Sequence, residues 1–317
     1  RNNPHVTKID SLHSLTVGNG RFAFTADATG LQTFPEVYKN GVPLGTQSQW
    51  GWHSFGNPEN YKPEEALVEY DFGHGHKELY ATQPKEPGRA KEASDWYRVN
   101  PHRLHLGIIG LELENEVRPS DVQNIQQSLD MWNGIINSRF TLKETPYHIQ
   151  TVCHPERDMI AARLSAQQPA GIKFHFPYPT GGHCDDACNW EANDKHSTTL
   201  VSEDAQSAVL KRTLDATTYY VTISWEGAAK LSEKSANYFV LTPTDSVFTF
   251  TCQFTPQASA SPILTFAEVQ QASSGHWQNY WTQGAVADFS QCTDVRAKEL
   301  ELSLIHISEP TRHLRIS

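Results

Sequence analysis

The feature that most constrains the fold of this chain is a long series of short segments rich in β-branched and aromatic residues, separated by turn residues. These segments are predicted as strands at residues 123–129, 135–142, 147–153, 159–166, 198–201, 208–214, 219–225, 238–242 and 246–254. Strands at this spacing are typical of an antiparallel all-β sandwich. Pro262 ends the series, and residues 266–271 and 275–282 have a helical composition. We therefore predict a large sandwich over residues 1–262 and a short helical linker over residues 263–301.

The composition supports a folded domain and excludes two classes of partner. Of the 317 residues, 38% are hydrophobic, which is enough for a sizeable core. The net charge of −10 and the lack of any basic run argue against binding to nucleic acid or to an anionic membrane surface. No run of about 18 apolar residues occurs, so we expect no membrane-spanning segment. The sequence makes no prediction of the oligomeric state.

The segment Ser14–Phe24, SLTVGNGRFAF, predicts a tight turn followed by a buried strand. An Asn-Gly pair flanked by β-formers is a strong hairpin signal, because both residues tolerate a positive φ. We expect strands at Arg21–Ala26 and Leu31–Phe34, with a turn between them at residues 28–30.

The segment Leu44–Tyr61 is the candidate wall of a sugar site. It has neither a helical nor a strand period, and it is rich in Gly, Ser, Asn and Pro. Long loops that carry large aromatic residues are often functional. Sugar rings stack on aromatic faces, so we predict Trp50, Trp52 and His53 as substrate-binding residues. The alternative is that these side chains fix an irregular loop to the sandwich.

The sequence contains no convincing metal site. His74 and His76 lack a third ligand, and we expect a surface turn within residues 71–87. The segment Gly181–Trp190, GGHCDDACNW, has ligand-type residues but no matching second half. An ordinary loop is the first interpretation, and a Cys184–Cys188 disulfide or a metal ion remain the alternatives. We predict no metal and no cofactor, and the five cysteines leave the redox compartment open.

The chain also lacks an evident catalytic pair. Residues 104–117 predict a strand with one wet face, formed by Glu112, Glu114 and Glu116. Side chains two residues apart on a strand face the same way, whereas glycosidases place two carboxyl groups on opposite sides of a bond. We predict no catalytic residue.

Three segments, in this order, resemble parts of glycoside hydrolases of the family 65 and family 95 type. Ser14–Phe24 resembles the Gly-Asn-Gly opening of their amino-terminal sandwich domain. QSLDMWNGIINSRFTL is similar to a segment that links two sandwich strands, and HWQNYWTQGAVADFSQC is similar to the linker after the sandwich. The matching positions are Leu129, Asp130, Met131, Gly134 and Phe140 in the second segment, and His276, Trp277, Trp281 and Phe289 in the third. The chain departs from these families in the tryptophan-rich loop and in GGHCDDACNW.

The resemblance implies a β-supersandwich of the galactose-mutarotase-like type. It also implies a non-catalytic amino-terminal domain of an enzyme that acts on the glycosidic bonds of oligo- or polysaccharides. In such enzymes the catalytic carboxylates belong to a following (α/α)6 barrel, and the resemblance implies that residues 263–301 hold the linker and the start of that barrel. We therefore expect this chain to be inactive alone. The carbohydrate substrate is the implied partner, and the implied location is periplasmic or extracellular. The alternatives are a stand-alone carbohydrate-binding protein and a mutarotase-type epimerase, which needs an exposed His and Glu as acid and base.

The carboxyl terminus has an unusual origin. Residues 302–312 read LSLIHISEPTR, which is the translation of a common transposase sequencing adaptor. We therefore expect residues 302–317 to be a non-native tail and residues 1–301 to be a fragment of a longer protein. The chain begins with Arg1, so the location can be inferred only indirectly.

Overall fold

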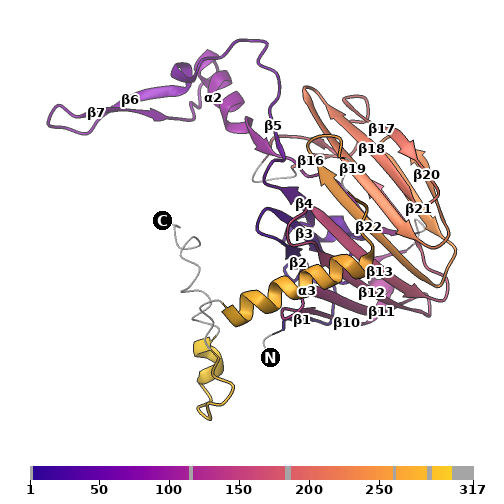
Figure 1. The fold of residues 1–317 in the computed structure, drawn as a ribbon. Helices are drawn as coiled ribbons and strands as arrows, with labels where there is room; N and C mark the ends of the chain where they lie inside the picture. The colour runs from indigo at the N-terminus through magenta and orange to yellow at the C-terminus, as the bar shows by residue number, and fades with distance from the viewer. Residues whose placement is uncertain (1–2, 114–116, 183–186, 260–261, 284–287, 302–317) are drawn as a thin grey trace.

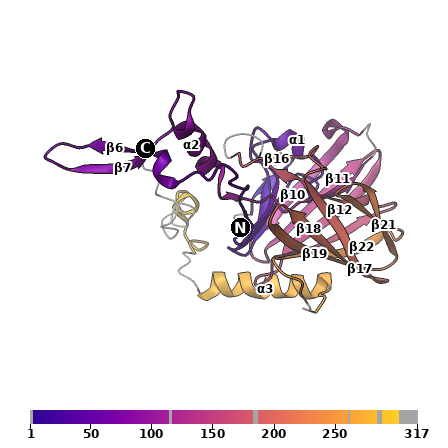
Figure 2. The ribbon, with the colours of Figure 1, turned by 90° about the horizontal axis from the view of Figure 1, so that it is seen from above.

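The fold is an all-β sandwich built on a nine-stranded antiparallel sheet. The computed structural model describes residues 3–113, 117–182, 187–259, 262–283 and 288–301. Figures 1 and 2 show the large sheet with helix α3 across its outer face. In order across the sheet, the strands are β1 (His5–Val6), β10 (Val122–Asp130), β11 (Ile135–Leu142), β12 (Thr145–Cys153), β13 (Met159–Ala166), β22 (Val247–Thr255), β19 (Thr217–Glu226), β18 (Ser207–Leu214) and β17 (His196–Glu203).

The second layer consists of two smaller antiparallel sheets. The four-stranded sheet has the order β20 (Ala229–Ser235), β21 (Tyr238–Pro243), β14 (Gly171–His175) and β9 (Ile108–Glu112). The three-stranded sheet contains β2 (Leu15–Gly18), β3 (Phe22–Ala26) and β4 (Gly45–Ser48). The core lies between the layers. The ring centroids of Phe250 in β22 and Phe174 in β14 are 6.0 Å apart, and those of Phe254 in β22 and Phe22 in β3 are 5.8 Å apart. Alternate inward-facing aromatic side chains thus hold the two layers together.

The hairpin prediction at the amino terminus is confirmed, but the strand predicted at residues 31–34 is wrong. Strands β2 and β3 pair through a turn in which Gly20 has a φ of +84°. After β3, the fully buried carboxylate of Asp27 accepts hydrogen bonds from the backbone N–H groups of Thr29, Thr33 and Phe34. A carboxylate that gathers these amides favours a closed loop over a strand. The short helix α1 (Pro35–Tyr38) follows this loop.

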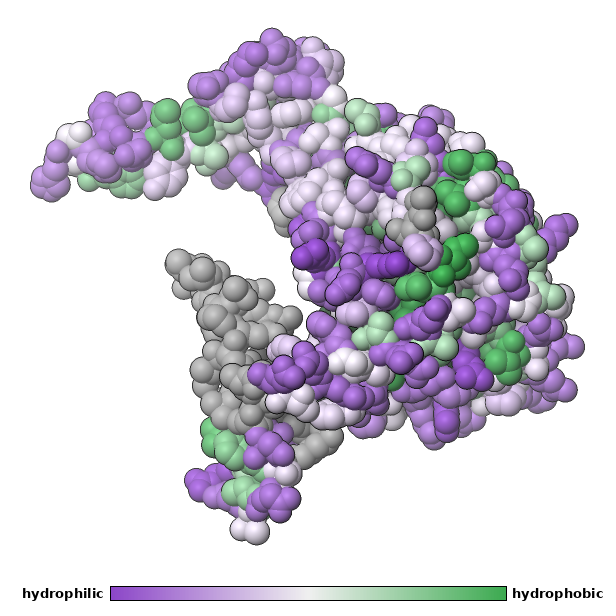
Figure 3. All heavy atoms as spheres, viewed as in Figure 1, coloured by the Kyte–Doolittle hydropathy of each residue, from purple (hydrophilic) through white to green (hydrophobic). Residues whose placement is uncertain are grey.

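An arm projects from the sandwich between residues 54 and 101 (Figure 1). Two short paired strands, β5 (Trp52–His53) and β8 (His102–Arg103), form its base. The arm contains η1 (Pro63–Ala66), the hairpin of β6 (Leu67–Asp71) and β7 (Lys77–Ala81), and α2 (Arg89–Val99). Figure 3 shows a hydrophobic patch on this otherwise mostly hydrophilic arm. The expected turn at residues 71–87 is therefore the end of a hairpin, and α2 was not predicted.

Helix α3 (Phe266–Gln283) confirms the predicted change to helical structure. Its buried residues Phe266 and Val269 pack against Val152 and Met159 on the outer face of the large sheet. The remaining elements are short: β15 (Tyr178–Pro179), β16 (Cys188–Asn189) and η2 (Pro119–Asp121). None of the helices in the described part of the chain is long and apolar enough to cross a membrane. The expected non-native tail, residues 302–317, lies outside the described residues.

Candidate functional site

One end of the sandwich gathers most of the segments that the sequence singled out. The strand register places the β10–β11, β12–β13 and β18–β19 turns at the same end of the large sheet, since Ile135 pairs with Val152 and Tyr220 pairs with Thr255. The Gly18–Gly20 turn lies there too, because Asn19 Nδ2 donates to the backbone carbonyls of His154 and Arg157 at 3.1 and 3.0 Å. We call this region the arm end, because the base of the arm and helix α3 both lie at it.

Trp50 connects the predicted sugar-site loop to the sandwich. Its indole Nε1 donates to Asp158 Oδ2 at 2.6 Å, and Ser48 Oγ donates to the same oxygen at 2.5 Å. The half-buried ring packs against the core, with its centroid 5.9 Å from that of Tyr219. These contacts favour the alternative interpretation of Trp50, in which the side chain fixes the loop in place.

Trp52 is the exposed aromatic residue of this segment. It is 46% exposed, and the guanidinium of Arg103 lies 4.3 Å from the centroid of its ring. Arg103 is in turn held by a 2.7 Å hydrogen bond from Nη1 to the Ser48 carbonyl. The stacked guanidinium fixes the orientation of the indole, so Trp52 presents a positioned aromatic surface to solvent.

His53 points the opposite way and is buried. Its Nδ1 lies 2.8 Å from Thr217 Oγ1, and its Nε2 lies 3.0 Å from Asp215 Oδ2. Burial and the neighbouring His102 lower the pKa of His53. The neutral ring can donate from Nε2 to the carboxylate and accept at Nδ1 from the threonine hydroxyl. Both nitrogens of His53 therefore have partners within the protein.

Asp215 is the hydrogen-bond partner of His53 that is exposed to solvent. Its side chain is 40% exposed, and its Oδ2 also accepts a 2.8 Å hydrogen bond from the hydroxyl of Tyr178. Burial and the carboxylate raise the pKa of Tyr178 to about 12, so the hydroxyl remains a donor. A fixed carboxylate of this kind can accept hydrogen bonds from sugar hydroxyls. Sequence reasoning missed Asp215 and Tyr178, because they lie more than 120 residues from His53.

The expectation that Leu44–Tyr61 lacks strand structure is wrong in part. Strands β4 and β5 lie within it, and they pair with β3 and β8. The alternation of side chains along β5 explains why Trp52 is exposed and His53 is buried.

Replacing the two tryptophans separately should distinguish their roles. Trp50→Ala removes core packing and one of the two side-chain donors to Asp158 Oδ2, so we expect a loss of about 2 kcal/mol or more in unfolding free energy. Trp52→Ala should cost about 1 kcal/mol or less, because only an exposed cation–π contact is lost. Urea denaturation of both variants measures the difference. Equal losses would contradict these assignments.

A concave region lies on the outer face of the four-stranded sheet. It is a hollow of about 550 Å³, and Trp190 of the GGHCDDACNW segment lines it. The sequence of this segment predicts an ordinary loop, with a Cys184–Cys188 disulfide or a metal ion as the alternatives. Cys188 is buried, but its candidate partner Cys184 lies outside the described residues, as do His183, Asp185 and Asp186. Within the described residues, no group of three or more His, Cys, Asp or Glu side chains is arranged to hold a metal ion.

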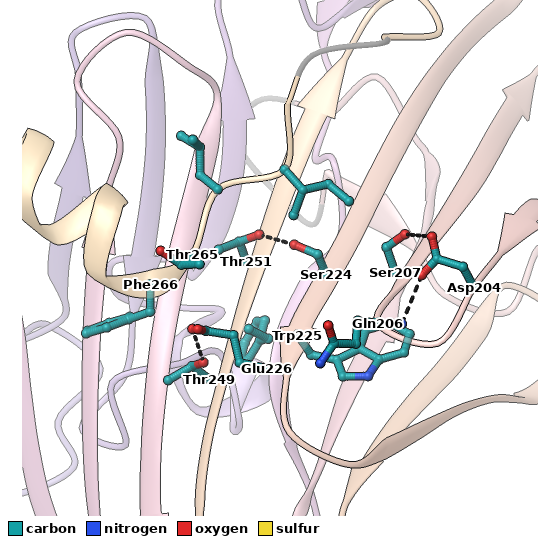
Figure 4. A pocket seen from close by; sticks show the side chains of 13 residues that line it. Asp204, Gln206, Ser207, Ser224, Trp225, Glu226, Thr249, Thr251, Thr265 and Phe266 are labelled. Carbon is teal, nitrogen blue, oxygen red and sulfur yellow. Dashed lines mark hydrogen bonds between the residues drawn. The ribbon is translucent and has the colours of Figure 1, made fainter.

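Another hollow, of about 290 Å³, lies beside the start of α3 on the large sheet (Figure 4). Six of its polar side chains pair with one another: Ser224 with Thr251 at 2.6 Å, Ser207 with Asp204 at 2.8 Å, and Thr249 with Glu226 at 2.6 Å. Because these groups already bond to each other, the hollow is a weak candidate for a polar ligand.

Comparison with known proteins gives structural neighbours only. No protein-family model matches the sequence, and no curated protein matches it. The solved structures that resemble the fold include "Putative kojibiose phosphorylase from human microbiome" (TM-score 0.44, 9% identity, 88% of this chain and 38% of that one). A bacterial glucoamylase complexed with acarbose is also similar (TM-score 0.34, 9% identity, 51% and 29%). A family 81 glycoside hydrolase from Clostridium thermocellum is a third neighbour (TM-score 0.28, 9% identity, 87% and 27%). The chain thus spans less than two fifths of each of these neighbours.

Proposed function

We propose that the chain is the non-catalytic amino-terminal β-supersandwich domain of a glycoside hydrolase that resembles families 65 and 95. The catalytic carboxylates would belong to an (α/α)6 barrel that follows α3. A carbohydrate would be the substrate, and a periplasmic or extracellular location rests on the resemblance alone. The proposal rests mainly on one observation: the three segments that carry the resemblance meet at the arm end.

The second and third of these segments contact each other directly, although about 140 residues separate them in the sequence. Trp281 Nε1 donates to the Met131 carbonyl at 2.6 Å, and Gln278 Nε2 donates to Asn133 Oδ1 at 3.0 Å. The Trp277 ring lies directly over Gly134. Through these contacts, the matched residues dock α3, the helix that follows the sandwich, onto the β10–β11 turn.

The first segment joins the same region through Asn19, which bonds the β12–β13 turn. That turn also holds Trp50 through Asp158 and the linker before α3 through a 2.8 Å hydrogen bond from Arg157 Nη1 to the Pro262 carbonyl. The arm and the linker helix are therefore fixed to one set of turns. This arrangement supports a role in which the arm end faces the catalytic barrel and Trp52 contributes to the sugar site there.

The proposal predicts that purified residues 1–301 hydrolyse aryl glycosides no faster than a blank. Glycoside cleavage requires two carboxyl groups on opposite sides of the bond, about 5 to 10 Å apart. At the arm end, Asp158 is instead hydrogen-bonded to Trp50, and Asp215 is hydrogen-bonded to His53. Robust hydrolysis that disappears in an Asp215→Asn variant would overturn the proposal.

In the longer protein, Trp52→Ala should lower kcat/KM at least tenfold, which corresponds to about 1.4 kcal/mol of transition-state binding. Val201→Ala is the matched control, because Val201 is 54% exposed on the edge strand β17. Unchanged activity of a folded Trp52→Ala enzyme would show that the arm end is not part of the site.

A further inference from the structure

The hollow around Trp190 is a concave site that the proposed function does not use. We call it the Trp190 groove. Its lining residues come mainly from helix α1 and the turn after it, from strand β14, and from the residues of and after β16. A smaller hollow of about 110 Å³ adjoins it and shares Glu36, Lys39 and Trp190 as lining residues. The larger volume of about 550 Å³ is typical of a small-molecule site.

Aromatic rings dominate one side of the groove. The half-buried indole of Trp190 lies 4.7 Å from the ring of His175 and 5.7 Å from the ring of His105, by centroid distance. The other neighbour of His175 is Tyr238, at 4.7 Å. Ring contacts with two histidines hold the indole in place at the groove, where it offers an apolar platform of fixed orientation.

The polar lining is mixed and balanced in charge. Lys39 and Lys173 carry positive charge, and Glu36 and Glu191 carry negative charge. Lys173 Nζ donates to the Thr33 carbonyl at 2.9 Å, and burial lowers its pKa. Burial, together with nearby Lys173 and Arg212, lowers the pKa of His175 to about 4, so this ring is neutral at pH 7. The groove therefore offers donors and acceptors without a net charge, a lining that suits an uncharged ligand rich in hydroxyl groups.

We propose that the Trp190 groove binds an uncharged pyranose, as a mono- or disaccharide, which stacks on Trp190 and exchanges hydroxyl hydrogen bonds with Glu36 and His175. This site is separate from the arm end, since it lies on the outer face of the four-stranded sheet rather than at the turns of the large sheet. Its test is therefore independent of the hydrolase proposal.

The experiment is saturation-transfer NMR of the purified chain with glucose, galactose, mannose and maltose, followed by titration of the intrinsic tryptophan fluorescence. We expect saturable binding of at least one of these sugars, and a dissociation constant raised at least tenfold by Trp190→Ala. Glu36→Gln, a change at an exposed position of the short helix α1, should also weaken binding while leaving the fold intact. Trp132→Ala is the matched control, because it removes another exposed tryptophan, which lies in the β10–β11 turn and lines no part of the groove, and it should leave the dissociation constant unchanged.

Several results would overturn the proposal. One is the absence of saturable binding to the wild-type chain at concentrations up to about 50 mM, well above ordinary weak affinities. A second is an unchanged dissociation constant in a folded Trp190→Ala variant. If Trp190→Ala does not fold, unchanged binding by Glu36→Gln overturns the proposal instead. Loss of binding in Trp52→Ala would place the sugar at the arm end instead. Much tighter binding of glucuronate than of glucose would contradict the assignment of an uncharged ligand.

Discussion

The unfolding free energy of this protein should fall by several kcal/mol when the pH is lowered from 7 to 4. Two histidines carry most of the expected effect. Burial, followed by the charge of Arg212, lowers the pKa of His196 to about 4, and burial with Lys173 and Arg212 does the same for His175. The geometry explains His196, because its Nδ1 lies 2.6 Å from Nη2 of the buried Arg212 and therefore accepts a hydrogen bond. A protonated ring would place two positive groups in contact.

The sign of the effect follows from which state binds the protons. In the unfolded chain both histidines titrate near 6.5, whereas in the folded chain they remain neutral until about pH 4. Their stabilisation is complete above pH 6.5 and is lost as the pH falls, because the unfolded state then binds more protons. A shift of this size corresponds to at most about 3 kcal/mol for each ring, and to less for the partly exposed His175. The lowered pKa values of His53 and His102 act in the same direction.

Urea denaturation at pH 7, 6, 5 and 4 measures the slope. His196→Gln should flatten it, because glutamine can still accept from Arg212 and does not titrate. His74→Asn is the matched control, since His74 is exposed in the β6–β7 turn with a φ of +56°, a conformation that asparagine adopts readily. A flat profile for the wild-type protein between pH 7 and 4 would contradict the buried neutral histidines.

The strands and helix that follow local patterns could be predicted from the sequence. The predicted bounds of β11 and β13 match the structure, because apolar alternation ends at clear turn residues there. Strand β20 was missed: it lies at the edge of its sheet, and its polar sequence AKLSEKS buries only Leu231. Helix α2 was missed because it buries only Ala93 and Ser94, which leaves no apolar stripe to detect.

The candidate sites were harder to predict for a different reason. The contacts that define each residue come from distant parts of the chain: Asp158 lies 108 residues from Trp50, and Asp215 lies 162 residues from His53. A local pattern identifies Trp52 and His53 together, but the strand separates them into an exposed and a buried residue. In the sequence, Trp190 is only the last residue of a segment of metal-like composition. Its ring neighbours His105 and His175 lie elsewhere in the chain, so no local pattern identifies the groove.

Gly134→Val should lower the unfolding free energy of this protein more than a substitution at an exposed surface position. It should also detach helix α3 from the β10–β11 turn. Gly134 has a φ of +65°, a conformation that costs a β-branched residue about 1 to 2 kcal/mol. A Cβ built there would lie 2.1 Å from Cδ1 of Trp277 and 2.8 Å from Oγ of Ser273. The helix would have to move away, which would break the hydrogen bonds from Trp281 to Met131 and from Ser273 to Asn133. We expect a total loss of about 3 kcal/mol or more in unfolding free energy.

The control separates the backbone cost from the lost docking of α3. Gly20→Val places valine at a φ of +84° with nothing within 4 Å of its Cβ, so only the backbone cost applies. Hydrogen exchange of residues 266–283 should accelerate in Gly134→Val and stay at the wild-type rate in Gly20→Val. Adding Trp277→Ala to Gly134→Val should then cost less than Trp277→Ala costs in the wild-type chain, because the clash and the ring are removed together. Strict additivity in this cycle would mean that the indole of Trp277 does not rest on Gly134, which would contradict the docking of α3 onto the β10–β11 turn.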